Sequence, residues 1–423
     1  MVVSIQPLAI SPRCRLLPSI KLTTTVPHPI AQSVEILTTV LTIAGMGYFI
    51  AALLAARVFL SARRAQLPDF TPGVSILKSL KGLDPSMIDA FRSHCRQAYS
   101  GEYELLFGVS SLDDPAATAV EQLKLEFPAH SIQLVECPAS LGANGKVSTL
   151  IQLAKQARHS YLLINDSDIS VSPRYLERVM AHFAPQTNIG KQHLEVGLVT
   201  ALYRGRAHTT LPSRLEALGI ATDFQAGVLL SRMIEGGLHY GLGSTLAVSR
   251  WALEKIGGLE TLVDHLADDY ELGARVDQAG YRVILSAEVV ETAIPAYTWR
   301  GFIDHQLRWE RTVRDARPWG YAGLIFTHGL AWALFNVIAS GLSPLSLWLL
   351  AMSFFLRLSV AMTVGAQVLA DHEVLPSLSL LPFRDLIAFF VWTFGFAGNT
   401  IVWRGQRFEL RNGKLRRTGP LQS

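Results

Sequence analysis

Two long stretches without charged side chains enclose a charged central part of the chain. Residues 36–56 and 318–356 contain no Asp, Glu, Lys or Arg. A helix needs about 20 apolar residues to cross a bilayer. Charged residues make up 17% of the chain, whereas a typical soluble protein carries about 25%. The sequence therefore predicts an integral membrane protein with one large domain between its membrane segments.

The first apolar stretch is predicted to be a transmembrane anchor over residues 34–60. Arg57, Arg63 and Arg64 follow its apolar part, and basic residues accumulate at the cytosolic ends of membrane helices. The domain that follows is therefore expected in the cytosol. A cleaved signal peptide is the rival interpretation, but the stretch is long and has no clean cleavage site of small residues.

The remaining compositional signals are weaker. Residues 1–33 contain five prolines and no acid, which predicts a disordered tail, with a transit peptide as the alternative. The net charge of +4 gives no reason to expect a nucleic-acid partner, and the basic residues lie beside apolar runs, as they do at a membrane surface. Cys14, Cys95 and Cys137 have neither a disulfide nor a metal-binding spacing, which fits a reducing compartment.

Residues 70–318 alternate between short apolar runs and amphipathic patterns, which predicts alternating strands and helices. The predicted strands are 74–80, 103–111, 132–136, 161–164 and 196–202. The predicted helices are 85–99, one after Pro115, 145–158 and one that runs from 268 to about 280. Repeated strand–helix units with short connections imply a mostly parallel, Rossmann-like sheet covered by helices, which is an α/β fold.

The C-terminal part is predicted to hold membrane helices over residues 319–403, as segments 321–341, 345–370 and 386–403. The tail 404–423 carries six basic residues against Glu409 alone. Three full crossings would leave this basic tail outside, against the positive-inside rule. One segment is therefore predicted to be re-entrant or interfacial, so that the tail is cytosolic.

Asp166 and Asp168 follow an apolar strand directly. Ligands of open α/β sheets bind at the carboxyl ends of the strands. Two carboxylates one residue apart can hold Mg²⁺ or Mn²⁺, which bind oxygen ligands and bridge substrate phosphates. The alternative interpretation is a solvated turn, because Asp and Ser are common in turns.

Further acids and a lysine stand at similar positions. Asp113 and Asp114 follow the second strand, where a carboxylate can bond a nucleobase or ribose, although an Asp before Pro115 also starts helices. Lys146 opens a helix together with Gly145, which suits a diphosphate; such a helix start is otherwise ordinary.

Asp269 lies in the segment Asp268-Asp269-Tyr270-Glu271 at the start of a helical pattern. A carboxylate there can act as a general base. Acids at a helix start also interact with the helix dipole without any chemistry. In a later arginine-rich helix, Arg308 can bind a phosphate and Trp309 can line an acceptor site, or the helix can lie on anionic headgroups.

In this order and spacing, the motifs resemble inverting family 2-like glycosyltransferases with a GT-A fold, in particular the ceramide glucosyltransferase family (family 21) and its bacterial hopanoid-glycosyltransferase relatives. The matching segments are 74–82, 113–116, 165–168, 268–270 and the Arg-Trp pair 308–309. His305 stands where the family has Gln or Arg, and Asn144-Gly145-Lys146 is similar to an Asn-Pro-Lys motif.

The resemblance implies transfer of a hexose, glucose or N-acetylglucosamine, from a UDP-sugar to the hydroxyl of a membrane lipid such as ceramide or a hopanoid. It implies a cytosolic site at a bacterial inner membrane, or at the Golgi or endoplasmic reticulum of a eukaryote. The implied roles are as follows: donor binding by Lys78, Asp113, Asp114, Lys146 and Asp166; Mg²⁺ or Mn²⁺ binding by Asp166 and Asp168; general base, Asp269; and diphosphate and acceptor contacts, His305, Arg308 and Trp309.

Two alternatives remain open. A processive polysaccharide synthase shares the acidic and Arg-Trp motifs, but this chain has few segments with which to build a polymer channel. A non-enzymatic scaffold or transporter is the other alternative. A transporter would distribute polar groups through many spans, whereas here Arg357 and His328 are the only ionisable residues deep in an apolar run.

Overall fold

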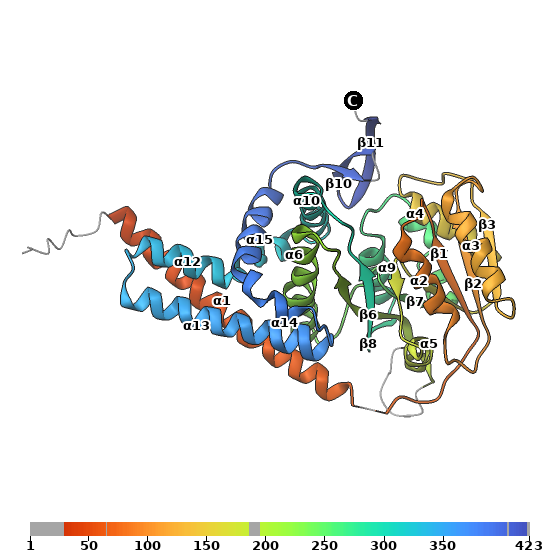
Figure 1. Cartoon of the computed structure of the whole chain (residues 1–423), viewed down its shortest axis with the longest axis horizontal. Coiled ribbons are helices and arrows are strands. Elements are labelled where there is room, and N and C mark those ends of the chain that lie inside the picture. The colour runs from red at the N-terminus through yellow and green to blue at the C-terminus, as the bar shows by residue number, and fades with distance from the viewer. Residues whose placement is uncertain (1–28, 65, 186–194, 404–405, 421–423) are drawn as a thin grey trace, which may run out of the picture.

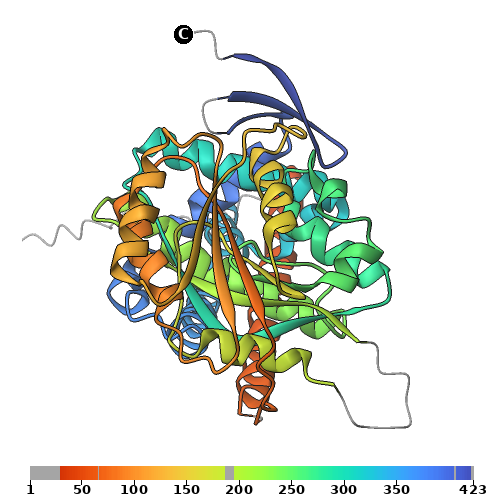
Figure 2. The ribbon, with the colours of Figure 1, turned by 90° about the vertical axis from the view of Figure 1, so that its right-hand side faces the viewer.

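A computed structural model describes residues 29–64, 66–185, 195–403 and 406–420. Eight strands form one sheet in the order β3-β2-β1-β4-β7-β6-β8-β5 (Figure 2). Their bounds are β1 Val74–Ser79, β2 Tyr103–Val109, β3 Ser131–Glu136, β4 Tyr161–Ile164, β5 Ile169–Ser170, β6 Val196–Arg206, β7 Leu246–Ser249 and β8 Arg282–Ala293. Four neighbouring pairs are parallel and three are antiparallel. The predicted mostly parallel α/β sheet is thereby confirmed. The antiparallel strand β7 was not predicted.

The central strands are buried on both faces. Every residue of β1 and β4 is buried, and Ile76 and Leu77 belong to apolar clusters on opposite sides of the sheet. Parallel strands covered by helices are expected to be apolar throughout. The core therefore consists of two layers of side chains, one on each face of the sheet.

Each face is covered by its own helices. One face packs against α2 Pro85–Cys95, α3 Pro115–Glu126 and α5 Tyr175–Met180. The other packs against α4 Gly145–Gln156, α7 Gln225–Ile234, α8 Arg250–Lys255 and α9 Asp268–Gln278. Asp84 and Asp114 cap α2 and α3, and each is followed by a proline at the first helical position. Such starts are stable because the cap accepts a backbone N–H and proline has none to satisfy.

The apolar helices gather at one end of the molecule. Figure 1 shows α1 Pro29–Ala62, α12 Gly329–Ala339 and α13 Pro344–Val360 side by side, far from β1 and β2. Three helical stretches are long and apolar enough to cross a membrane, namely 29–62, 344–368 and 374–395. A fourth candidate is a bent pair, 318–326 and 329–339, with an angle of 52° between its parts. The predicted tail 1–33 lies mostly outside the described residues, and α1 begins at Pro29.

A layer of helices lies between these helices and the sheet. It contains α6 Leu211–Gly219, α10 Trp299–Ala316, α14 Val374–Ser377 and α15 Leu381–Gly395 (Figure 1). The π-helix η2 Ile220–Phe224 continues α6, and η5 Ala361–Val368 continues α13. α12 and α13 pack along α1, whereas α15 packs along α10 and α6 and also contacts α12. The C-terminal helices are therefore not equivalent, because α12 and α13 belong to the apolar bundle and α15 connects that bundle to α10 and α6.

The third predicted membrane segment, 386–403, is wrong at its C-terminal end. The helix ends at Gly395, and Gly398 has a positive φ of 74°. Thr400–Trp403 forms strand β9, which pairs with β10 Gln406–Arg411, and β10 pairs with β11 Lys414–Pro420. Asn412 and Gly413 have positive φ values of 53° and 75° between β10 and β11, as a two-residue hairpin turn requires.

The tail that these strands form is therefore a folded sheet that projects beside the main one (Figure 2). It hydrogen-bonds to the segment that leads into α9: Leu415 N donates to Asp264 O at 2.8 Å and Leu266 N to Gly413 O at 3.3 Å.

Candidate active site

The loop after β4 carries Asp166 and Asp168, and buried hydrogen bonds hold it in place. Asn165 is buried, and its amide donates to Tyr175 Oη at 2.9 Å and to Ser244 O at 2.6 Å. The buried Lys78 Nζ donates to Asp166 O at 3.0 Å. Burial lowers the pKa of Lys78 to about 7, although Asp168 and Asp166 act in the opposite direction. Lys78, which was predicted to bind the donor, thus contacts the backbone of the acidic loop.

Lys146 joins two of the acidic segments. Its Nζ lies 2.8 Å from Asp166 Oδ1 and 3.2 Å from Asp268 Oδ2. Asn144 caps α4 and donates to Asp268 Oδ1 at 3.3 Å, which ties the start of this helix to the start of α9. Burial acts to lower the pKa of Lys146, but Asp166, Asp268 and Asp269 outweigh it and raise the pKa. The lysine is therefore a permanent cation inside the acidic cluster.

Asp269 and Asp166 approach the same point from different segments. A Cβ atom added to Gly243 would lie 3.0 Å from Asp269 Oδ2 and 3.3 Å from Asp166 Oδ2. Only glycine leaves this space open. Burial, and then repulsion from Asp268, raises the pKa of Asp269 to about 6, while Lys146 lowers it. At neutral pH the carboxylate is ionised, and its proton affinity is higher than that of an exposed Asp.

Asp168 is bonded to the neighbouring strand β8, because its Oδ2 accepts a hydrogen bond from Thr292 Oγ1. Burial and then Asp166 raise the pKa of Asp168, and the Thr292 bond opposes this shift. The carboxylate is thus oriented by a neutral donor, and no cationic side chain among the described residues forms an ion pair with it.

Asp113 and Asp114 stand apart from this cluster. Both carboxylate oxygens of the cap Asp114 accept from Gly82 N at 3.0 Å, and Oδ1 also accepts from Ala116 N. Asp113 is exposed and bonds to Ser111. Among the described residues no hydrogen bond or ion pair joins either Asp to Asp166, Asp269 or Lys146. Their place beyond β2, next to β1, is still the carboxyl edge of the parallel strands.

The predicted residues of α10 belong to a set of packed rings. His305 stacks on Tyr297, with ring centroids 5.3 Å apart, and lies 5.1 Å from Trp309. Trp309 lies 6.1 Å from Phe224, which lies 5.7 Å from Tyr203. We call these five side chains the aromatic wall. The Arg308 side chain lies close enough to Tyr297 to lower its pKa, although burial raises that pKa overall.

Tyr203 connects the aromatic wall to the acidic cluster. Burial raises the pKa of Tyr203, and negative charge on Asp269, Asp166, Glu216 and Asp168 raises it further. Carboxylates of the β4 loop, α9 and α6 thus all raise the pKa of this one phenol. The predicted sites at the β4 loop, at α9 and on α10 therefore border one region of the molecule.

The whole-chain sequence pattern agrees with this local geometry. The pattern of glycosyl transferase family 21 matches residues 37–416. The chain belongs to this family. It is therefore a glycosyltransferase, as the motifs predicted.

Two relatives of this family 21 glycosyltransferase come from Caenorhabditis elegans. Ceramide glucosyltransferase 3 is 23% identical over 356 residues, which cover 81% of this chain and 73% of the relative. Ceramide glucosyltransferase 1 is 22% identical over 364 residues, with coverages of 83% and 74%. Among solved structures, a mannosyltransferase from Pyrobaculum calidifontis, in complex with GDP-Man and Mn²⁺, superimposes with a TM-score of 0.51 at 19% identity, covering 86% of this chain and 99% of its own. This likeness supports the GT-A fold.

Motif patterns missed several side chains of this glycosyltransferase site. Thr292, Tyr203 and Tyr297 carry no motif of their own. Glu216 does carry a signal, because it is a single acid within the apolar run Leu215-Glu216-Ala217-Leu218 and is buried. A buried carboxylate inside a helix needs a specific partner, and its partner is His305 Nδ1 at 3.2 Å.

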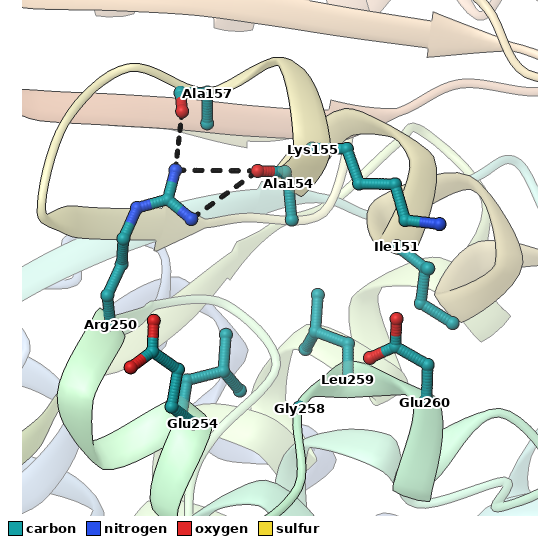
Figure 3. Close-up of a pocket in the computed structure, with 10 residues that line it drawn as sticks. Ile151, Ala154, Lys155, Ala157, Arg250, Glu254, Gly258, Leu259 and Glu260 are labelled. Carbon is teal, nitrogen blue, oxygen red and sulfur yellow. Dashed lines mark hydrogen bonds between the residues drawn. The ribbon is translucent and has the colours of Figure 1, made fainter.

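A groove elsewhere on the domain has a structural explanation. It lies between α4 and α8 and has a volume of about 340 Å³, and Figure 3 shows the residues that line it. Arg250 donates to the carbonyls of Ala154 and Ala157 at the end of α4 (Figure 3). None of the predicted site residues lines it. Arg250 satisfies carbonyls that would otherwise be unpaired at a helix end.

Proposed function

We propose that this family 21 enzyme transfers a hexose from a UDP-sugar to the hydroxyl of a membrane lipid, with inversion at the anomeric carbon. One observation carries the proposal: Asp269 and Asp166 face one open point beside Gly243, and Tyr203 connects that point to the aromatic wall. Two carboxylates thus meet where a donor, an acceptor and a proton acceptor have to converge.

The reaction is a single displacement. The lipid hydroxyl oxygen attacks the anomeric carbon, the bond to the UDP oxygen breaks, and Asp269 accepts the hydroxyl proton. A pKa of about 6 suits this task, because the carboxylate is ionised at pH 7 yet more basic than an exposed Asp. Lys146 binds the UDP-sugar donor, and Arg308 supplies a second positive charge that contacts the diphosphate.

Asp166 and Asp168 are the side chains that would hold Mg²⁺ or Mn²⁺. Within the described ranges, no three His, Cys, Asp or Glu side chains form a metal cage by themselves. Two carboxylate ligands from the protein would nevertheless suffice if substrate phosphates supplied further oxygen ligands. A bound divalent cation supplies positive charge against the departing diphosphate. The Pyrobaculum mannosyltransferase is in complex with Mn²⁺ and a nucleotide sugar, which supports this assignment.

A lipid acceptor follows from the position of the aromatic wall. Phe224 belongs to η2, whose Thr222 O accepts from Arg357 Nη1 of α13 at 3.0 Å. The wall therefore extends from the acids to the apolar helices. The two C. elegans relatives are ceramide glucosyltransferases by name, which makes ceramide the first acceptor to test.

The domains proposed for this enzyme are an anchor within α1, a catalytic domain over residues 70–318, and C-terminal helices in which α12 and α13 form a hairpin. α12 is only about 16 Å long, so this hairpin either dips into the bilayer or crosses it together with the bent segment before it. In both cases the chain returns to the side of the catalytic domain, to which the tail sheet is hydrogen-bonded. Arg57, Arg63, Arg64 and the basic tail then share the cytosolic side.

Purified protein in vesicles tests the activity. We expect a one-sugar lipid with inverted configuration when UDP-[¹⁴C]glucose or UDP-[¹⁴C]N-acetylglucosamine is supplied with ceramide, a diacylglycerol-like lipid or a hopanoid. Mass spectrometry of the lipid extract identifies the product. A polymeric product, or no labelled lipid with any of these donors and acceptors, overturns the proposal. A tag at the C-terminus that protease reaches only from the cytosolic face of the membrane supports the proposed orientation, and a tag reached only from the opposite face contradicts it.

A further inference from the structure

Glu216 is a charged residue at a position where an apolar residue is expected. It lies on α6 between the buried residues Leu215 and Ala217, and its side chain is 2% exposed. A buried carboxylate is strongly unfavourable unless hydrogen bonds satisfy it. Glu216 Oε2 lies 3.2 Å from His305 Nδ1 on α10, 89 residues further along the chain. This contact accounts for the presence of the acid.

The contact also fixes the imidazole of His305. Tyr297 stacks on one side of the ring, with 30° between the planes, and Trp309 lies on α10 itself, one turn away. Because a carboxylate can only accept, Nδ1 donates to Glu216. In a neutral imidazole the other nitrogen, Nε2, is then an acceptor. No described residue forms a hydrogen bond with Nε2, whereas Nδ1 is bonded to Glu216 and the ring is stacked on Tyr297.

The pair lies on the acceptor side of the site. Asp166 and Lys146 are joined by an ion pair at the donor side, and the charges of Asp269, Asp166 and Glu216 all act on Tyr203. From His305 the aromatic wall continues through Trp309 and Phe224 to η2, which packs on η5, the continuation of α13. A lipid that approaches Asp269 from the bilayer passes this wall, whereas the nucleotide binds at the carboxyl ends of β1, β2 and β4.

We infer that Glu216 is a positioning residue for acceptor binding: it fixes the imidazole of His305 so that Nε2 makes a hydrogen bond with a second polar group of the lipid. The inference rests on the proposed function. It defines the acceptor as a lipid with a hydroxyl or amide group close to the reacting hydroxyl. Ceramide has both groups, and a simple long-chain alcohol has neither.

The test compares two acceptors and four variants in the vesicle assay. The acceptors are the lipid that the wild-type protein glycosylates and a long-chain alcohol of matched length. The variants are Glu216→Ala, Glu216→Gln, His305→Ala and the Glu216→Ala/His305→Ala double variant. Glu104→Ala is the control for loss of a buried carboxylate, because Glu104 is also buried and is bound to Arg158 at 2.8 Å and to Ser75 Oγ at 2.6 Å. KM for lipid, alcohol and UDP-sugar is measured for each protein, together with its thermal stability.

We expect Glu216→Ala to raise KM for the lipid about tenfold to a hundredfold, with KM for the UDP-sugar and for the alcohol unchanged. Glu216→Gln retains most lipid affinity, because its amide oxygen still accepts from Nδ1. The double variant is no worse than His305→Ala, because both substitutions remove one interaction.

Two results overturn the inference. One is a Glu216→Ala protein that behaves like Glu104→Ala, with lower stability and unchanged KM values. The other is an equal rise in KM for lipid and alcohol. If instead the wild-type protein glycosylates no lipid, the proposed function fails and the inference fails with it, so the two failures are distinguishable.

Discussion

Buried charges are arranged in opposite ways in two regions of the molecule. Near the apolar helices α12 and α13, two arginines form close pairs: Arg357 donates to both oxygens of Asp385 at 2.8 and 2.9 Å, and Arg384 lies 2.9 Å from Asp223. At the carboxyl edge of the sheet there are four acids, and among the described side chains only Lys146 forms an ion pair with any of them, with Asp166 and Asp268. Asp166, Asp168, Asp268 and Asp269 are these four.

This difference separates the charges that stabilise the fold from the charges that are available for catalysis. A buried ion pair with all its hydrogen bonds made has no need of a ligand, and breaking it leaves an uncompensated charge. A surplus of carboxylates is tolerable only if protons or external cations balance it. Burial, and then repulsion from a neighbouring Asp, raises the pKa values of Asp168 and Asp269. The paired region is therefore expected to set stability, and the unpaired region to set activity.

The strongest test of the contrast is Asp269→Asn. We expect kcat to fall about 10²- to 10⁴-fold, because the general base is lost, while UDP binding measured by calorimetry persists. Thermal stability should not fall. The folded-state pKa of about 6 lies above the ordinary value of 3.8, so ionised Asp269 reduces stability as pH rises from about 4 to 6, and Asn removes that penalty.

Asp277→Asn is the matched control on the same helix, because Asp277 bonds to His239 at the surface side of α9. It should leave kcat near the wild-type value. A fully active Asp269→Asn protein would remove Asp269 from the mechanism.

Arg357→Met changes the paired region, and in contrast to Asp269→Asn it should lower stability. Leaving Asp385 buried without its cation is expected to lower the free energy of unfolding by about 3–5 kcal/mol, measured by thermal unfolding in detergent. The double variant Arg357→Met/Asp385→Leu should recover much of this loss, since no lone charge remains. Arg92→Met breaks a surface pair with Glu126 and should change stability far less, because exposed ion pairs contribute little. Equal losses for Arg92 and Arg357 would contradict the assignment.

The pH dependence of transfer tests the surplus of negative charge directly. The rate should fall below pH 6, approaching about tenfold per pH unit, because the base becomes protonated. Lys146 lowers the pKa of Asp269, so Lys146→Met should move this acid limb to higher pH. The pH–kcat profile at saturating donor measures the shift, and a limb that stays in place in Lys146→Met rules out their coupling.

Thr292→Val should have the smallest effect. It removes the hydrogen bond to Asp168, so the pKa of that carboxyl rises further. An ordinary hydrogen bond contributes about 0.5–1.5 kcal/mol, which corresponds to a rise in donor KM of about twofold to tenfold at limiting Mg²⁺ or Mn²⁺. Thr292→Ser keeps the hydroxyl and should behave as wild type. If Ser and Val at this position give the same KM, the bond does not orient Asp168.

Residues close in sequence could be interpreted in advance because short-range rules govern them. Strand ends, caps and apolar stretches predicted the α/β fold, the β4 loop and the start of α9. The Asn412-Gly413 turn is equally local, yet the basic composition of the tail gave no reason to expect paired strands around it. The end of α15 was placed too late for a related reason: an apolar run through Trp403 fits a helix or a strand equally well.

The sequence alone determined which segments are apolar, which acids end strands and which family motifs occur, because these depend on neighbours along the chain. Only the tertiary structure decided which charges meet. Arg357 and Asp385 are 28 residues apart, and Glu216 and His305 are 89 apart. Such pairs form where helix packing brings side chains together out of water, and no local pattern encodes that distance.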